Sequence, residues 1–295
     1  DLYKDKPLRP PFVGDWETDE YLKRDGRIFD SKTGPIDPEL MRQAQIGYYA
    51  CITHLDHQIG RLILALVEQE LYDDCIFLFT SDHGEELCDH HMFRKSRPYE
   101  GSCHIPLLIS AGANVLPGLK RGETCHTVAE LRDVMPTLLD AAGAPIPASL
   151  DGKSLLPLTY DPSGSVREWL HGEHSYGEFS NHWIGTSRDK FIWHSTSGRE
   201  QYFDLADDPH ELHDRILDSG GRHQSPGRYF CSFKAAAPRR QAAAARIGKR
   251  SDRRYNSGFA RLSPLPRSRA GSRRGTAHST GTAGTVSYTH LTLPT

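Results

Sequence analysis

The clearest periodic pattern in the sequence lies between residues 37 and 70. Asp37 can cap a helix, Pro38 suits the first helical position, and Glu39 places a negative charge in the first turn. Apolar side chains then recur at helical spacing, at Leu55, Ile59, Leu62, Ile63 and Leu66. The pattern predicts a long amphipathic helix that ends near Glu70 and turns this apolar stripe towards a core.

Apolar runs further along the chain predict buried strands. Residues 75–80 (CIFLFT) are apolar on both faces, which is typical of a strand in a parallel sheet with helices on each side. Residues 105–110 (IPLLIS) predict a second strand. A short helix is predicted between Asp133 and Gly143, because a helix tolerates Pro136 only in its first turn. This alternation predicts an α/β fold with a mostly parallel sheet.

Short β-like stretches follow at residues 183–187, 190–195 and 201–205. Turn-forming pairs, Arg188-Asp189 and Ser197-Gly198, separate these stretches and predict a small antiparallel meander.

The predicted elements divide the chain into regions. We expect an α/β domain over residues 1–159 and a small antiparallel subdomain over residues 160–215. Residues 1–36, rich in Pro, Gly and charge, are expected to form an extended surface segment.

The charge balance changes abruptly after residue 215. The whole sequence has 36 Lys and Arg against 38 Asp and Glu, but residues 216–295 hold 15 basic residues and only two acidic ones. This segment has no Glu and no sustained hydrophobic period, and its last ten residues resemble a translated sequencing adapter. We interpret it as a disordered or artefactual tail, from a shifted reading frame or an adapter, and expect no nucleic-acid partner. A nucleic-acid-binding tail is the alternative.

The cysteines and the hydropathy give weaker indications. Before the tail the cysteines are Cys51, Cys75, Cys88, Cys103 and Cys125. An odd number without C-x-x-C spacing favours reduced thiols, and so slightly favours the cytoplasm over the periplasm of a bacterium. No apolar run reaches the length of a membrane span, so none is predicted.

The strongest candidate for chemistry follows the predicted strand at residues 75–80. Asp82 and His83 would lie at its carboxyl end, the edge at which open α/β sheets bind ligands. A carboxylate and an imidazole can share a metal ion, and Gly84 would allow the sharp turn that points both at one ion. On its own such a pair more often forms an ordinary loop hydrogen bond, so the spacing alone does not establish a metal site.

Longer blocks around this pair resemble a known family. They are YYACITHLDHQIGRLILAL, IFLFTSDHGEELCDHHMFRKSRPYEGSCHIPLLI, ELRDVMPTLLDAAGAPIPASLDGKSLLPL and QYFDLADDPHELHD. Their order and content resemble bacterial arylsulfatases of the alkaline phosphatase superfamily, over about residues 1–215. The resemblance implies an alkaline-phosphatase-like α/β sandwich, hydrolysis of sulfuric esters, and a small-molecule or carbohydrate sulfate ester as substrate.

The resemblance also implies site residues. It implies that Asp82 and His83 bind the active-site divalent metal, and that Lys95, in FRKSRPYE, is a catalytic residue that binds a sulfate oxygen. Ca²⁺ is the expected ion, although His83 stands where many sulfatases have Asn and admits Mn²⁺ or Zn²⁺. His174, in HGEHS, is a candidate for substrate binding, with a plain loop role as the alternative.

One part of the family pattern is missing from this chain. Sulfatases use a formylglycine made from a C/S-x-P-S-R motif, and that pattern follows none of the cysteines. We therefore expect the formylglycine upstream of residue 1 and predict that this chain alone is inactive. Two further alternatives stay open: a phosphonate monoester or phosphodiester hydrolase of the same superfamily, and a catalytically inert fragment or binding module.

Other polar residues are weaker candidates. Cys88, His90, His91 and His104 could be read as a zinc cluster, but their spacing fits no structural zinc pattern. Arg97 and Glu100 could pair beside Lys95 and support it.

Overall fold

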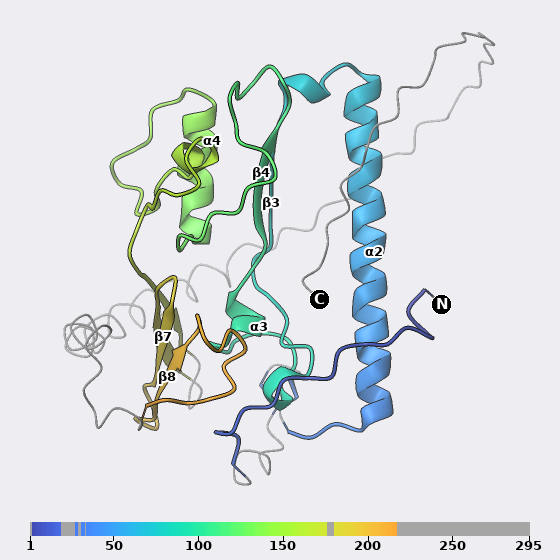
Figure 1. Cartoon of the computed structure of the whole chain (residues 1–295), viewed down its shortest axis with the longest axis vertical. Coiled ribbons are helices and arrows are strands. Elements are labelled where there is room, and N and C mark those ends of the chain that lie inside the picture. The colour runs from blue at the N-terminus through green and yellow to red at the C-terminus, as the bar shows by residue number, and fades with distance from the viewer. Residues whose placement is uncertain (1, 19–26, 29–30, 33, 176–179, 217–295) are drawn as a thin grey trace, which may run out of the picture. The chain divides into compact units, whose positions relative to one another are not determined.

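A computed structural model describes residues 2–18, 27–28, 31–32, 34–175 and 180–216 (Figure 1). The chain divides into two compact units, residues 1–243 and 244–295, and the second lies wholly outside the described residues. The predicted tail also lies outside them, apart from Ile216, so its interpretation stays a prediction.

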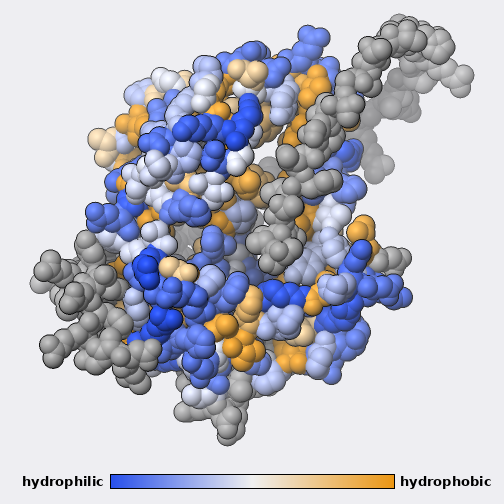
Figure 2. Space-filling model, viewed as in Figure 1, coloured by the Kyte–Doolittle hydropathy of each residue, from blue (hydrophilic) through white to orange (hydrophobic). Residues whose placement is uncertain are grey.

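The predicted long helix is present as α2, Pro38–Glu68, which Figure 1 shows as one continuous ribbon. The Asp37 carboxylate caps it by accepting hydrogen bonds from the backbone N–H groups of Glu39 and Leu40, both at 3.0 Å. The predicted core stripe is only partly buried: Leu55 and Leu62 are 51% and 60% exposed, whereas Ile59, Ile63 and Leu66 are half-buried. Apolar side chains are visible at the surface in Figure 2. Capping is a local property of the sequence, whereas burial depends on what packs against the helix.

The two apolar runs form the strands β3 (Ile76–Thr80) and β4 (Leu107–Ala111). Thr80 lies opposite Leu107, and the pairing is antiparallel. All other strand pairings in the described residues are antiparallel too, so the predicted parallel pairing is not found in this part of the chain. The physical reason is that an apolar run reports burial on both faces of a strand and carries no information on the direction of its neighbour.

The shorter elements connect these strands. They are β1 (Arg27–Ile28), β2 (Ser31–Lys32), α3 (Glu100–Cys103) and the 3₁₀ helices η1 (Tyr72–Asp74), η2 (Asp89–His91), η3 (Leu131–Asp133) and η4 (Leu156–Thr159).

The second predicted helix is α4, Val134–Ala141, with Pro136 in its first turn. Gly143 follows the helix with a φ of +66°, the left-handed conformation that suits glycine. Asp133 directly precedes the helix as predicted, but its carboxylate makes no hydrogen bond that caps α4. It accepts instead from the guanidinium of Arg167 and from the backbone N–H of Lys153, the latter at 2.8 Å.

The predicted meander is confirmed, with one strand added before it. Its strands are β5 (Leu170–His174), β6 (Asn181–Gly185), β7 (Asp189–His194) and β8 (Glu200–Asp204). They are hydrogen-bonded in this order, and each pairs antiparallel with the next.

The meander contributes to two apolar clusters, because side chains alternate between the faces of a sheet. One cluster joins Ile192 and Phe203 to Trp16, Met92 and Tyr99. The other contains Ile184, Phe191 and Tyr202. Trp16 is only 6% exposed, so the prediction of a purely surface segment at residues 1–36 is wrong at this position.

Candidate functional site

The structure brings together three of the residues singled out in the sequence. Asp82 and His83 lie just after β3, and Lys95 reaches them from further along the same loop, residues 81–99. The Nε2 atom of His83 lies 2.8 Å from the Nζ atom of Lys95 and 3.5 Å from the Oδ2 atom of Asp82. A carboxylate, an imidazole and an ammonium group therefore meet at one edge of the β3–β4 pair.

The hydrogen bonds of His83 determine which ring nitrogen can bind a cation. Its Nδ1 atom lies 2.7 Å from the carbonyl oxygen of Gly84. A carbonyl oxygen only accepts, so Nδ1 carries the proton and Nε2 presents a lone pair. The Asp82 side chain is 82% exposed, and its Oδ2 atom is near enough to Nε2 for both to take adjacent positions on one cation. The donor set fits part of a divalent metal site.

Gly84 positions this pair through a close approach of two backbone segments. Its N–H donates to the carbonyl oxygen of Ser102 at 2.8 Å. A Cβ atom on Gly84 would lie 2.1 Å from the carbonyl oxygen of Gly101, which is too short for any side chain. Residue 84 must therefore be glycine because two backbone segments approach closely here. The sequence analysis had given a different reason, a sharp turn of the chain.

The loop that carries Lys95 is conformationally strained. Six non-glycine residues in it have positive φ: Leu87, Cys88, His90, His91, Arg94 and Ser96. Such conformations persist only when surrounding contacts hold them. The Glu85 carboxylate accepts from the backbone N–H groups of Leu87, at 3.0 Å, and Arg94. Lys95 lies between two of these residues, Arg94 and Ser96, so the contacts of Glu85 help to fix its position. The sequence analysis did not identify this role of Glu85, because no periodic pattern indicates it.

The residues weighed as a zinc cluster do not come together. His90 and His91 both contact the Glu17 carboxylate, with N–O distances of 3.0 and 2.5 Å. His104 instead pairs with Glu100 at 2.8 Å. These histidines therefore serve different carboxylates, and the zinc interpretation finds no support in the described residues.

A buried ion cluster connects the meander to the segment after Lys95. Lys190, on β7, is 3% exposed, and its Nζ atom contacts Glu100 and lies 2.9 Å from the Oε1 atom of Glu211. Burial opposes its ionisation, but the two carboxylates outweigh burial and raise the pKa of Lys190 above its usual value. Burial likewise opposes the ionisation of Glu100, yet Lys190 and His104 lower the pKa of Glu100 to about 2. The expected Arg97–Glu100 pair is replaced by these partners.

Glu86 lies beside this cluster with a wholly buried side chain. Burial raises its pKa well above the ordinary value of 4.5, and the negative charges of Glu211 and Asp89 raise it further. Lys190 and Arg97 oppose this shift only in part. The carboxyl group of Glu86 therefore keeps its proton to a higher pH than an exposed glutamate does.

His174 ends β5 and lies opposite Asn181 on β6. Burial lowers its pKa, and the positive charge of Arg97 lowers it further, so its imidazole is neutral near pH 7. Arg97 belongs to the Lys95 loop, so His174 is within electrostatic range of that loop. Its role in substrate binding stays a prediction, as do the metal and sulfate roles of Asp82, His83 and Lys95.

Sequence reasoning missed a second group of polar side chains on the meander, formed by His171, Glu173 and His182. A signal was available, because alternate residues of a strand share a face and His171 and Glu173 are two residues apart.

Comparisons with known proteins identify the family. Residues 11–144 match the family model described as Sulfatase. Residues 88–224 match the model described as N-sulphoglucosamine sulphohydrolase, C-terminal. An arylsulfatase from Clostridium perfringens is 48% identical over 212 residues, which cover 72% of this chain and 44% of that protein. The chain therefore spans less than half the length of this relative.

Solved structures share the architecture. A phosphonate monoester hydrolase from Silicibacter pomeroyi superposes with a TM-score of 0.55 and 26% identity, covering 72% of this chain and 43% of that one. A protein solved in complex with its substrate D-glucosamine-2-N,6-O-disulfate superposes with a TM-score of 0.52 over 70% and 40% of the two chains; at 23% identity it shows the fold alone. The predicted alkaline-phosphatase-like α/β fold is confirmed.

Among the described helices, none has the length and apolar character needed to cross a membrane. With both family models matched between residues 11 and 224, this chain belongs to the sulfatase family of the alkaline phosphatase superfamily.

Proposed function

We propose that the protein acts as an arylsulfatase-like sulfuric ester hydrolase whose active site includes Asp82, His83 and Lys95. The observation that carries this proposal is the meeting of these three side chains after β3, in a chain of the sulfatase family. A small-molecule or carbohydrate sulfate ester is the proposed substrate. Residues 1–159 would belong to the catalytic α/β domain and residues 160–215 to a C-terminal subdomain.

The charges of this site suit a sulfate ester. The ester is an anion that repels a negatively charged nucleophile, so positive charge must be placed near its oxygens. Asp82 and His83 would hold a divalent cation, with Ca²⁺ as the first candidate and Mn²⁺ or Zn²⁺ admitted by the imidazole. That cation would supply positive charge to the ester oxygens and to the charge that develops on the leaving group. Lys95, whose Nζ atom also lies beside Nε2 of His83, would add a second positive charge.

The contact between Lys95 and His83 suggests how the two positive charges are arranged. The Nζ atom of Lys95 lies 2.8 Å from the nitrogen that would ligate the metal. With a cation held by Asp82 and His83, like-charge repulsion would favour a Lys95 ammonium turned away from Nε2, where it can bind a sulfate oxygen.

The proposed site of Asp82, His83 and Lys95 has no formylglycine, so the nucleophile would come from another part of the protein. The family motif C/S-x-P-S-R follows none of the cysteines in the 295-residue sequence. A formylglycine from an upstream segment is the proposed nucleophile. We accordingly expect this chain alone not to hydrolyse 4-nitrophenyl sulfate.

Phosphonate monoester hydrolysis is the second candidate. The solved phosphonate monoester hydrolase is 26% identical to this chain, and an imidazole is a suitable ligand for the transition metals that such sites can use. The two functions differ in the charge and shape of the substrate, so relative turnover separates them.

The test completes the chain with the upstream half of the clostridial arylsulfatase and compares kcat/KM for 4-nitrophenyl sulfate and 4-nitrophenyl phenylphosphonate. We expect the sulfate to be the better substrate and a chelator to remove the activity. A preference for the phosphonate would assign the second function. Absence of turnover of both substrates, with the formylglycine verified by mass spectrometry, would contradict both.

A further inference from the structure

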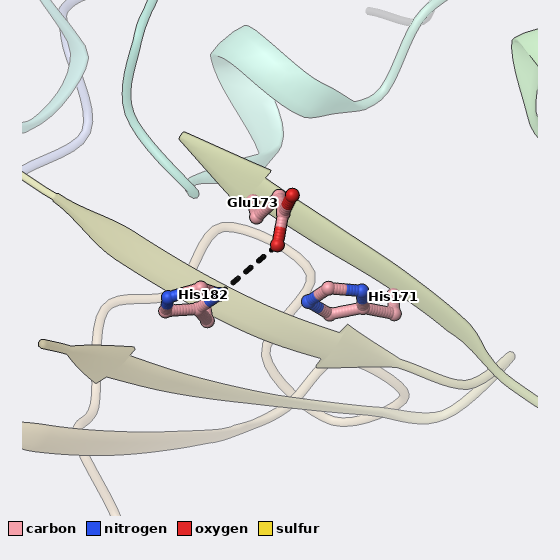
Figure 3. Close-up of side chains that lie close together, drawn as sticks. All are labelled: His171, Glu173 and His182. Atoms are coloured by element: carbon pink, nitrogen blue, oxygen red, sulfur yellow. Dashed lines mark ion pairs between the residues drawn. The ribbon is translucent and has the colours of Figure 1, made fainter. Parts of the chain in front are cut away.

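We propose that His171, Glu173 and His182 form a binding site for a divalent transition-metal ion, of which Zn²⁺ is the best match. The three side chains come from adjacent strands of the meander, β5 and β6 (Figure 3). His171 and Glu173 are alternate residues of β5, and Glu173 lies directly opposite His182. Alternate residues and directly opposed residues share one face of a sheet, so the fold itself places all three on the same side.

The spacing of the ligand atoms is close to that of a metal site. One nitrogen or oxygen atom from each residue lies within 4.8 Å of the others, and the Nδ1 atom of His182 is 3.5 Å from the Oε2 atom of Glu173. Bonds of about 2.0–2.2 Å to a tetrahedral zinc ion place neighbouring ligands about 3.4 Å apart. The His182–Glu173 pair already has this separation. The Glu173 side chain is 46% exposed, so its carboxylate has room to adjust towards an ion between the two histidines.

The histidine rings are held in place before any ion binds. His182 is 1% exposed and stacks against Trp193 on β7, with ring centroids 5.5 Å apart. The rings of His171 and His182 are nearly parallel, at 12°. Figure 3 shows a ring nitrogen of each directed towards the other, with the Glu173 carboxylate between them. Preorganised ligands lose little conformational freedom on binding, which favours affinity.

The residue types of the three ligands indicate which ion fits the site. A neutral imidazole offers a lone pair to a transition-metal ion. Two imidazoles with one carboxylate match zinc better than calcium, which prefers oxygen ligands alone.

A metal here would affect the opposite face of the sheet. His174 follows Glu173 and therefore points to the other side of β5, the side on which Arg97 influences it. An ion that joins β5 to β6 would fix the position of both strands and so of His174. Three protein ligands would leave a fourth position for water.

The test measures Zn²⁺ binding by the full chain carrying Asp82→Ala, which removes the other candidate metal site. After treatment with a chelator, calorimetric titration with ZnCl₂ should give one bound ion per chain. Adding His171→Gln, or in a separate variant Glu173→Gln, should weaken binding by at least about 100-fold, since even the loss of groups that only support metal ligands weakens binding 10–100-fold. Adding His213→Gln is the matched control, because it removes an exposed histidine that pairs with a single carboxylate, Asp15.

Co²⁺ provides a second measurement. The Asp82→Ala chain should show visible absorption typical of nitrogen and oxygen ligation, and His171→Gln should remove it without changing the far-ultraviolet circular dichroism. Binding that does not change in His171→Gln and Glu173→Gln would overturn the proposal. So would the absence of Zn²⁺ binding by the folded Asp82→Ala chain, or an equal loss of binding in His213→Gln.

Discussion

Two regions of this protein organise polar side chains in opposite ways. In the loop of residues 81–99, irregular backbone carries Asp82, His83 and Lys95, and it is held by two backbone N–H groups that donate to the Glu85 carboxylate. In the meander of β5–β8, a regular antiparallel ladder places His171, Glu173 and His182 on one face. The loop stores strain to present its groups, whereas the ladder positions side chains without strain.

The difference shows where each region is vulnerable. A ladder distributes its backbone hydrogen bonds over many similar pairs, so no single hydrogen bond decides its conformation. A strained loop depends on a few contacts, each of which fixes several residues. Lys190 connects the two regions. It belongs to the ladder, and its carboxylate partners are Glu100, directly after the loop, and Glu211, in the segment that follows β8.

The largest effects should come from the loop groups that face the substrate. In the enzyme completed with an upstream half, Asp82→Ala should abolish turnover of 4-nitrophenyl sulfate. Lys95→Ala should lower kcat/KM by about a hundred- to ten-thousand-fold, the scale of losing one transition-state charge partner. Lys120→Ala, at an exposed lysine outside the site, should change it little. An enzyme indifferent to Asp82→Ala would place the chemistry elsewhere.

Removing the charge of Lys190, which connects the two regions, should have the next largest effect, on the free energy of unfolding. Lys190→Met leaves the buried carboxylate of Glu211 and the partly exposed carboxylate of Glu100 without their shared cation. Removing one partner of a buried ion pair costs about 3–5 kcal/mol, so urea unfolding should show a loss of that size. The same change at exposed Lys120 should cost less than about 0.5 kcal/mol. Equal effects at the two lysines would mean that the cluster does not join the regions.

A smaller loss is expected where the loop packs against its neighbour. Gly84→Ala puts a methyl group into the contact with the Gly101 carbonyl oxygen, which is backbone and cannot rotate away. Overpacking of this kind costs about 1–3 kcal/mol, measured by urea unfolding. Gly185→Ala, on β6, is the matched change in the ladder, because the nearest atom to its Cβ would be a leucine side chain at 3.8 Å. A larger loss at Gly185 than at Gly84 would contradict the comparison.

The smallest effect should appear as a change with pH. Glu86 has a pKa raised well above 4.5, so its contribution to stability is present at low pH and is lost as the pH rises towards that raised value. Glu86→Gln keeps the shape of the protonated group and removes this loss. The free energy of unfolding of Glu86→Gln relative to the unchanged protein should therefore rise with pH above 4.5, by at most about 1.4 kcal/mol per pH unit. A difference that is independent of pH would show that Glu86 ionises normally.

Much of the local structure was readable from the sequence. Asp37 and Pro38 marked the start of α2, the run at residues 75–80 marked β3, and turn residues separated the strands of the meander. The strand-end pair of Asp82 and His83 was identified as well. These features depend on neighbours within a few residues, so spacing and residue type are enough to determine them.

The tertiary structure decided what those elements contact. Trp16 donates from Nε1 to the carbonyl oxygen of Glu211 at 2.7 Å, across 195 positions of the chain. Other contacts also join separate elements. Glu100 pairs with Lys190, β3 pairs antiparallel with β4, and His171 meets His182. Local periodicity reports which side of an element is apolar, but not which element lies against it, because that choice is made by packing of the whole chain.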